Sequence, residues 1–257
     1  NREDFLETYV IHIYPDTLTW THDYSYSFND PYTKNYFWHP AFDDYPVVGV
    51  NWKQANAFAN WRTKKMNEFL RKTNQPTLPD FRLPTESEWE WAARGGLDAS
   101  PYPWGGPYTR NIKGCFLANF KPLRGNYVAD GGIKTIKTKS YNPNGYGLYD
   151  MSGNVAEWTS NAFDESAFSY AHDMNADYHY DAETPETDNG EIDIDREGEE
   201  NIAEVLKRKV IRGGSWKDIA YFVQTGTRTF EYQDTAKSYI GFRCAVDFLG
   251  RSKKDFE

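Results

Sequence analysis

Polar and apolar positions alternate with helical spacing in one long stretch near the middle of the first half of the chain. Residues 47–50 (VVGV) form a short apolar run, which predicts a buried strand. Asn51 follows as a natural helix N-cap, with Gln54 three residues later. Apolar residues then recur on one helix face, at Ala55, Phe58, Ala59, Met66, Phe69 and Leu70. The pattern predicts an amphipathic helix over about residues 52–71.

A second helix is indicated by a capping box, and the rest of the chain has no helical period. Thr85 and Glu88 have the spacing of the box, and Gly95 with Gly96 ends the helix. From about residue 101, Gly, Pro and Asn separate short aromatic stretches, which favours turns and short strands. Residues 1–46 are expected to be irregular and rich in aromatic side chains.

Composition agrees with a core built from loops. The chain has 257 residues, with 19 Tyr, 16 Phe and 9 Trp. Large aromatic side chains bury wide faces and need few regular neighbours, so a helical bundle is not expected. The length is enough for a sizeable core.

The net charge of −9 comes almost entirely from one segment. Residues 181–204 hold 11 acidic residues and one Arg, a local charge of −10, which leaves about +1 for the rest. Low hydrophobicity and heavy charge over about residues 163–207 predict a surface insertion. No basic stripe is evident along the sequence, so nucleic acid is not an expected partner.

Seven short motifs follow one another in a fixed order. They are PVVGVNWKQANAFANWR, FRLPTESEWEWAARGG, YPWGG, ANF, NGYGLYDMSGNVAEWT, RGGSW and GFRCA. Together they resemble the formylglycine-generating enzyme (sulfatase-modifying factor) family over residues 46–248. The resemblance implies an α+β fold, irregular and C-type-lectin-like, with little regular secondary structure. We therefore expect residues 1–257 to form a single domain with its core at about 46–248.

The same resemblance implies where the family's catalytic cysteines would lie, and this chain has no cysteine at either position. The family uses two nearby cysteines that bind copper(I) after the GGS motif. Here those positions are Asp218 and Val223. A carboxylate is a hard ligand and valine is no ligand, so neither replaces a soft thiolate. The sequence predicts no catalytic residues, no copper and no enzyme of this type.

Other chemistries find no support in the sequence. Only Cys115 and Cys244 are present, and Cys244 lies where the family has a structural cysteine whose partner position is Ala93 here. Cys244 is expected to be a buried thiol, with a disulfide to Cys115 as the alternative. The five histidines show no HxxxH or HExxH spacing, and no GxSxG or phosphate-binding loop occurs.

The resemblance also implies two structural calcium sites. The first corresponds to Asp150, Gly153, Val155 and Glu157, with two carboxylates and two backbone carbonyls, a donor set that suits calcium. The second corresponds to the side chains of Asn119 and Asp130 with the carbonyls of Phe120 and Gly132. The alternative for both is that these residues only cap turns. A near match to an EF-hand loop over residues 193–204 favours a solvated acidic loop, and its calcium binding stays open.

Three segments resemble one branch of the family more closely. YFWHPAFDDYPVVGV, GGPYTRNIKGCFLANFKPLRGNY and VAEWTSNAFDESA are similar to the gliding-motility and type IX secretion lipoproteins of the GldK and PorK type. This implies a periplasmic protein, tethered to the outer membrane by a lipid upstream of Asn1, that forms a ring with a partner of the PorN or GldN type.

The sequence is compatible with three functions. The first is a structural subunit of an envelope complex, with Tyr26, Tyr36, Phe37 and Trp38 as interface anchors or as ordinary core residues. The second is a lectin-like ligand- or peptide-binding module that uses a groove beside Trp216 and Asp218. The third is an active oxidase.

Overall fold

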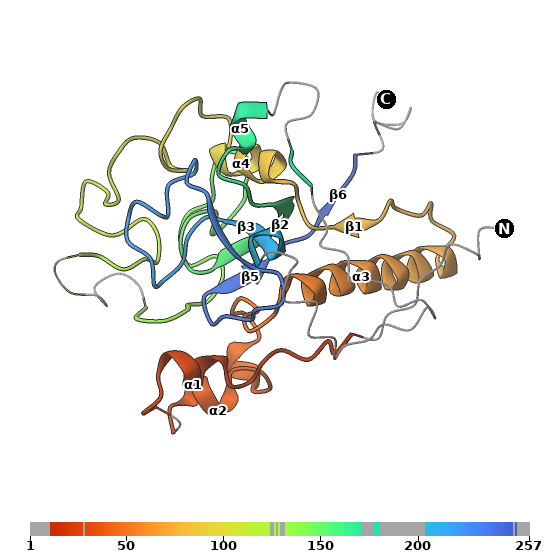
Figure 1. Cartoon of the computed structure of the whole chain (residues 1–257), viewed down its shortest axis with the longest axis horizontal. Coiled ribbons are helices and arrows are strands. Elements are labelled where there is room, and N and C mark those ends of the chain that lie inside the picture. The colour runs from red at the N-terminus through yellow and green to blue at the C-terminus, as the bar shows by residue number, and fades with distance from the viewer. Residues whose placement is uncertain are drawn as a thin grey trace.

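The computed structural model describes residues 11–27, 29–123, 126, 128, 132–170, 177–179, 204–248 and 250. Within these residues, few helices surround a small mixed sheet, and long loops make up much of the molecule (Figure 1). This confirms the expected α+β architecture with little regular structure.

The central sheet has four strands in the order β4-β3-β2-β5. They are β2 (Ala156–Ala162), β3 (Arg208–Arg212), β4 (Thr229–Tyr232) and β5 (Ile240–Phe242). β3 pairs antiparallel with both β2 and β4, whereas β5 runs parallel to β2. A separate antiparallel pair joins β1 (Phe81–Arg82) to β6 (Ala245–Val246).

The core lies around the central strand β2. Trp158 is completely buried and packs with Ala55, Leu83, Ile211 and Ile240. Its indole Nε1 donates a hydrogen bond to the carbonyl of Val50 at 3.1 Å, so the buried polar edge is satisfied. The strand therefore connects the helix-bearing half of the chain to the C-terminal strands.

The long helix α3 (Trp52–Lys72) confirms the prediction from helical spacing. Asn51 accepts from the Gln54 backbone N–H and Gln54 accepts from that of Asn51, both at 2.9 Å, which completes the predicted capping box. Only Ala55, Ala59 and Thr63 are buried, because small side chains allow close packing against β1. Phe58 and Phe69, which the pattern assigned to the apolar face, are exposed.

The second helix, α4 (Glu86–Arg94), also begins and ends as predicted. Thr85 and Glu88 form the capping box, and Gly95 ends the helix with a left-handed φ of 58°. The helix packs on β2 and β3. It buries Trp89 and Ala93 against Met151.

The predicted strand over residues 47–50 is wrong. Val48 and Val50 are buried as expected, but Gly49 takes a φ of 70° that interrupts an extended strand. Its N–H donates to the carbonyl of Lys237, and its carbonyl accepts from the N–H of Asp16. The segment is therefore bonded to two loops instead of a sheet ladder.

The N-terminal aromatic segment folds into short helices that pack on the body. They are α1 (Thr19–Asp23), α2 (Pro31–Asn35) and the 3-10 turn η2 (Pro40–Phe42). Trp20 and Tyr36 are buried with Val48, Val155 and Trp216. Tyr36 is thus a core residue and Phe37 packs beside it, while Tyr26 and Trp38 are exposed by 96% and 65%.

The predicted acidic insertion lies mostly outside the described residues. Its described parts are residues 163–170, which include α5 (Ala167–Tyr170), residues 177–179 and the 3-10 turn η4 (Glu204–Lys207), which leads into β3. Asp177 accepts hydrogen bonds from Asn161 Nδ2 at 3.0 Å and from the N–H of Ser87 at 3.2 Å, which attaches the insertion to β2 and α4. Among the described helices, none has the length and apolarity needed to cross a bilayer.

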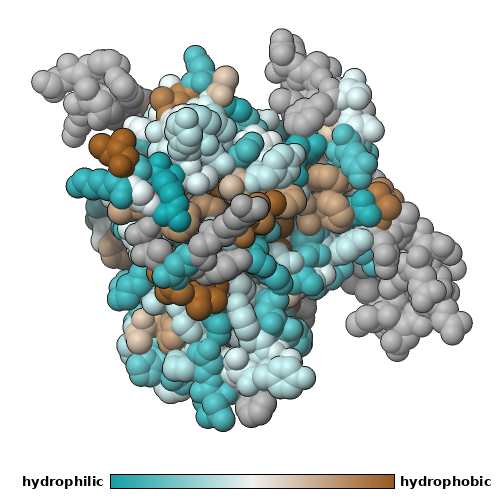
Figure 2. Space-filling view, turned by 90° about the vertical axis from the view of Figure 1, so that its left-hand side faces the viewer, coloured by the Kyte–Doolittle hydropathy of each residue, from teal (hydrophilic) through white to brown (hydrophobic). Residues whose placement is uncertain are grey.

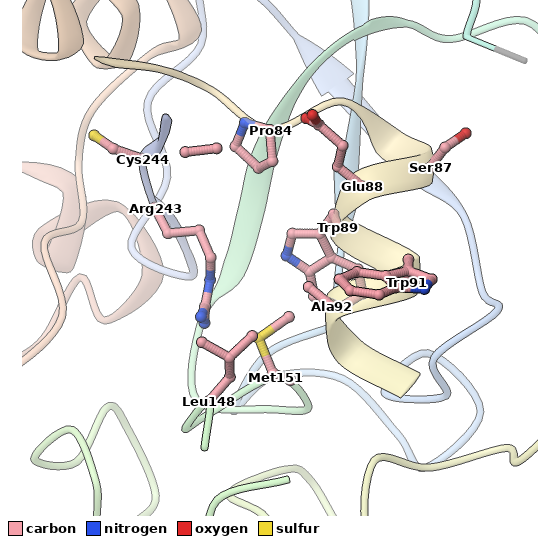
Figure 3. Close-up of a pocket in the computed structure, with 11 residues that line it drawn as sticks. Pro84, Ser87, Glu88, Trp89, Trp91, Ala92, Leu148, Met151, Arg243 and Cys244 are labelled. Carbon is pink, nitrogen blue, oxygen red and sulfur yellow. The ribbon is translucent and has the colours of Figure 1, made fainter. Parts of the chain in front are cut away.

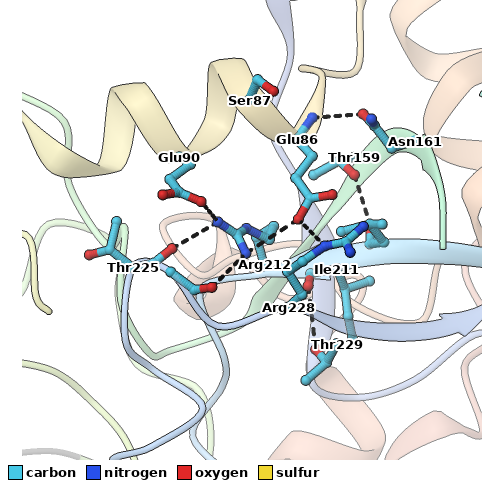
Figure 4. A network of polar contacts seen from close by, with 12 residues as sticks. Glu86, Ser87, Glu90, Thr159, Asn161, Ile211, Arg212, Thr225, Arg228 and Thr229 are labelled. Atoms are coloured by element: carbon cyan, nitrogen blue, oxygen red, sulfur yellow. Dashed lines mark hydrogen bonds and ion pairs between the residues drawn. The ribbon is translucent and has the colours of Figure 1, made fainter. Parts of the chain in front are cut away.

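A buried charge network fixes α4 to the sheet (Figure 4). The side chain of Arg212 is fully buried and pairs with Glu90 and, at 3.3 Å, with Glu86. Arg228 pairs with Glu86 at 2.6 Å from the opposite side. Burial lowers the pKa of Arg212, and both glutamates oppose that shift. We assign this network to stability, because every charged group in it has a partner.

Candidate functional site

The loop that follows β3 holds Asp218 and Val223, the two positions at which the sequence resemblance implies catalytic cysteines in the family. Gly214 has a φ of 62°, and a Cβ there would meet the Phe222 carbonyl oxygen at 2.6 Å, so the tight turn requires glycine. Asp218 Oδ2 accepts from the backbone N–H of Ser215 at 2.9 Å and from its hydroxyl at 2.6 Å. The Asp218 carboxylate therefore closes the turn.

Val223, at the second of these positions, is a core residue. It is completely buried against Tyr102, Phe116, Ala118 and Phe120. Its carbonyl accepts a hydrogen bond from the Ser152 hydroxyl at 2.7 Å. Neither position holds a sulfur atom, and the side chain of Val223 is inaccessible to solvent.

Both cysteines of the chain are free thiols, so the alternative of a Cys115–Cys244 disulfide is not realised. Cys244 is partly buried, and burial raises the pKa of its thiol although Arg62 opposes the shift. A thiol whose pKa is raised is a weaker source of thiolate for copper binding.

A small hollow lies beside Trp216, where a binding groove was expected. It measures about 230 Å³ and is lined by Tyr24, Phe120, Trp216, Lys217 and neighbouring residues. The rings of Tyr24 and Trp216 stack with centroids 6.0 Å apart. Lys217 pairs with Asp23 at 2.5 Å, so aromatic and charged groups line the same hollow.

The residues of the first predicted calcium site lie in one buried loop that leads into β2. Asp150 has a φ of 55° and Gly153 a φ of 75°. A Cβ at Gly153 would lie 2.4 Å from the Asn119 carbonyl oxygen, so only glycine permits this close approach. Glu157 is the second residue of β2 and is 6% exposed.

The two carboxylates of this loop, Asp150 and Glu157, lie close enough to influence each other. Burial raises the pKa of Asp150, and the nearby carboxylate of Glu157 raises it further, while Arg243 and the Lys139 N–H oppose the shift. Glu157 is also held by protein donors, namely Arg243 Nη2 at 2.6 Å and Trp89 Nε1 at 2.7 Å. No cluster of three or more His, Cys, Asp or Glu occurs among the described residues, so a cation here would depend on the carbonyls of Gly153 and Val155 as well.

The second predicted site is described only in part, because Asp130 lies outside the described residues. Asn119 and Gly132 are brought together, since Asn119 Oδ1 accepts from the Gly132 N–H at 3.3 Å. The Asn119 amide also donates to the Lys134 carbonyl at 2.9 Å. Phe120 is buried against Phe116 and lines the hollow beside Trp216 together with Gly132.

Two residues that the sequence interpretation missed connect these loops. Asn154 is buried, its N–H donates to the Asn119 carbonyl at 2.8 Å, and its side chain bonds both backbone groups of Ile136. Arg243 pairs with Glu157 through two nitrogens. Their motifs, GNVAEW and GFRCA, were noted, but the contacts join positions 18 to 86 residues apart and leave no local signal.

A larger pocket of about 520 Å³ lies between α4 and the segment around β6 (Figure 3). Trp89, Trp91, Leu148 and Met151 give it mainly apolar walls. The sulfur of Cys244 points away from α4. The charged groups at this pocket are committed to partners, since Arg243 pairs with Glu157 and Glu88 pairs with Arg82 at 2.6 Å.

The face shown in Figure 2 is mixed in polarity where the described residues form it. In Figure 2, which faces the left-hand side of Figure 1, hydrophobic residues form small groups among hydrophilic ones.

Comparison with known proteins gives a consistent result. The model of the sulfatase-modifying factor enzyme 1-like domain matches residues 20–248. The formylglycine-generating enzyme of Thermomonospora curvata is 34% identical over 210 residues, which cover 80% of this chain and 57% of the relative. The inactive C-alpha-formylglycine-generating enzyme 2 of Mus musculus is 31% identical over 216 residues, which cover 82% of this chain and 51% of the relative. The chain thus spans about half the length of these curated relatives.

Two solved structures share the fold. Treponema denticola variable protein 1 aligns with a TM-score of 0.51 and 27% identity, over 80% of this chain and 72% of that protein. PvdO from Pseudomonas aeruginosa aligns with a TM-score of 0.55 and 23% identity, over 80% of this chain and 63% of that protein. At that identity the second alignment demonstrates the fold alone.

Proposed function

Because this chain belongs to the sulfatase-modifying factor enzyme 1-like domain family, whose relatives include active and inactive formylglycine-generating enzymes, we propose that it is a non-catalytic structural subunit. The complex in which it would serve is the type IX secretion ring of the bacterial envelope, which acts in protein secretion and gliding motility. Its likeness to the GldK and PorK lipoproteins is the ground for that assignment.

The structural use of the two former cysteine positions carries the proposal. Asp218 accepts two hydrogen bonds that close a turn, and Val223 fills an aromatic cluster. Copper(I) requires soft, accessible thiolate ligands, which a hydrogen-bonded carboxylate and a buried valine do not provide. The family fold is retained here while its redox chemistry is not.

A structural calcium ion is part of the same proposal. Asp150 and Glu157 would hold it together with the carbonyls of Gly153 and Val155, and Asn119, Asp130, Phe120 and Gly132 would hold a second ion. Calcium supplies positive charge and gathers loop carbonyls, which stabilises a domain with few regular elements. Asp150, whose pKa is raised by burial, is the group that benefits most from such charge.

The proposed location and partner follow from the same likeness. The protein would lie in the periplasm, tethered to the outer membrane by a lipid, and form a ring with a PorN- or GldN-type subunit. Two exposed aromatic residues of the N-terminal segment, Tyr26 and Trp38, suit an interface of this kind.

Light scattering after size exclusion, with and without a GldN-type partner, tests this function. We expect a stable complex with the partner that is lost when Tyr26→Ser and Trp38→Ser are combined. Tyr108→Ser, at a residue 76% exposed in another loop, is the matched control and should assemble normally. The absence of any complex with the unsubstituted chain would reject the assignment.

The second candidate is a lectin-like ligand- or peptide-binding module. The hollow of about 230 Å³ beside Trp216 favours it, because stacked aromatic rings and a charged pair line one small cavity. Glycan and peptide arrays would test it. A specific hit that Lys217→Ala abolishes would favour this reading, and an empty array would favour the structural subunit.

A further inference from the structure

The exposed flank of α3 combines aromatic and basic side chains in an ordered stripe. Phe58, Trp61 and Phe69 are exposed by 41%, 53% and 59%. Helical geometry places them on one flank with Lys65 and Lys72, away from the buried Ala55, Ala59 and Thr63. We call these five residues, Phe58, Trp61, Lys65, Phe69 and Lys72, the aromatic-basic stripe.

Two rings of this stripe, those of Phe58 and Trp61, contact each other. The centroid of the Phe58 ring lies 5.5 Å from that of Trp61 and 5.4 Å from that of Phe242, the last residue of β5. Lys65 and Lys72 both contact Glu68, which stands between them on the helix surface. The stripe follows one face of a single α-helix and is about 16 Å long between Phe58 and Phe69 at the rise of an α-helix.

The charge of α3 is opposite to that of the chain. The helix carries six basic residues and one acidic residue, a net charge of +5, although the chain as a whole carries −9. The remainder of the chain therefore carries −14. The basic residues of α3 are Lys53, Arg62, Lys64, Lys65, Arg71 and Lys72.

Further apolar side chains extend the surface at the start of the helix. Gln54 donates hydrogen bonds to the carbonyls of His12 and Tyr14 at 2.7 and 3.1 Å, so this segment runs along α3. Ile13 and Tyr14 are exposed by 72% and 64%. Figure 1 shows the chain leading to α1 passing along the same side of the molecule as α3.

We propose that the aromatic-basic stripe of α3 docks this protein onto the surface of an anionic phospholipid bilayer, with the helix lying in the plane of the headgroups. Aromatic rings enter the boundary between headgroups and acyl chains, while lysine stems carry their ammonium groups up to the phosphates. The net positive charge of the helix is attracted to the anionic surface.

The form of the surface favours a bilayer over an acidic protein partner. None of the pockets described above is lined by residues of α3. A protein partner generally anchors its central side chains in pockets, whereas a bilayer needs only a long, even face with aromatic and basic groups mixed along it. This inference does not depend on the assembly role proposed above.

Vesicle cosedimentation of the whole chain tests the proposal. The probes are vesicles of phosphatidylcholine alone and of an equal mixture with phosphatidylglycerol. We expect binding to the anionic vesicles only, and its loss at about 1 M salt, where the screening length falls to about 3 Å. Replacing Lys65 and Lys72 with Gln should weaken binding by at least about tenfold.

The aromatic part of the stripe is tested separately. Trp61→Ser combined with Phe69→Ser should weaken binding by about tenfold or more, because two apolar groups are lost from the lipid boundary. Tyr108→Ser combined with Ile112→Ser removes two apolar side chains that are more exposed than Trp61 and Phe69 from another loop, and this variant should bind as the unsubstituted chain does. Circular dichroism confirms that each variant is folded.

Three results would overturn the proposal. They are no binding to anionic vesicles, equal binding by the α3 variants and the controls, and an α3 variant that binds vesicles normally but loses a complex with an acidic protein. The last result would assign the stripe to a protein interface instead.

Discussion

Replacing Arg243 by methionine would remove the positive charge that pairs with Glu157 in the Asp150–Glu157 loop. In the folded chain, Arg243 donates to both oxygens of Glu157 and to the carbonyl of Tyr149, the residue before Asp150. Methionine keeps much of the apolar stem and removes the guanidinium. Glu157 then loses its ion-pair partner, and Asp150 loses a nearby positive charge.

The size of the effect follows from the burial of the pair. Removing one partner of a buried ion pair costs about 3–5 kcal/mol. We expect a cost of about 3 kcal/mol, at the lower end of this range, because solvent screens a partly exposed pair. The side chain of Arg243 is 28% exposed and that of Glu157 is 7% exposed. For a chain of 257 residues, each kcal/mol shifts Tm by about 2–4 °C, so Tm should fall by about 6–12 °C without calcium.

Thermal melts in EGTA and in excess calcium measure the outcome. If calcium binds this loop, it replaces the missing positive charge, so Arg243→Met should gain more Tm from calcium than the unsubstituted chain does. Glu157→Gln is the matched variant with the opposite change, and it should gain less. Equal calcium gains in all three proteins would refute the reasoning about this loop.

The remaining predictions use other parts of the structure. Gly153→Ala should lower the free energy of unfolding by more than about 1 kcal/mol in urea titrations, because its Cβ would meet the Asn119 carbonyl; an unchanged midpoint would contradict the packing. For Asp30, burial opposes ionisation, but hydrogen bonds from Lys134 and the Tyr32 N–H lower its pKa overall. Its stabilisation is thus present above the ordinary carboxyl pKa and is lost as pH falls through the lower folded pKa, so Asp30→Asn should flatten this part of the acid-unfolding curve.

The local signals in the sequence were sufficient for the helices. The capping boxes at Asn51 and Thr85 involve residues three apart, so both helix starts could be predicted without tertiary information. The apolar period of α3 was also correct, but Phe58 and Phe69 are exposed, because the close contact with β1 leaves room only for Ala55 and Ala59. Periodicity gives the face of a helix and not its depth of burial.

The strand predicted at residues 47–50 failed for the reason that long-range contacts usually escape sequence patterns. Its burial was correct, but its backbone partners, Asp16 and Lys237, lie far away in the chain. Arg243 escaped notice in the same way, because only the fold brings it to Glu157. The loop residues Asp150, Gly153 and Glu157 were found because they follow a recognisable motif, although their calcium remains a prediction.

The central claim, that this domain has kept the fold and lost the oxidation chemistry, has one direct test. The purified chain is incubated with copper(I), oxygen and a Cys-x-Pro-x-Arg peptide, and mass spectrometry follows the peptide cysteine, with an active formylglycine-generating enzyme as the positive control. The account predicts that the peptide stays unmodified, since Asp218 and Val223 supply no thiolate. Conversion of the cysteine to formylglycine by this chain would contradict it.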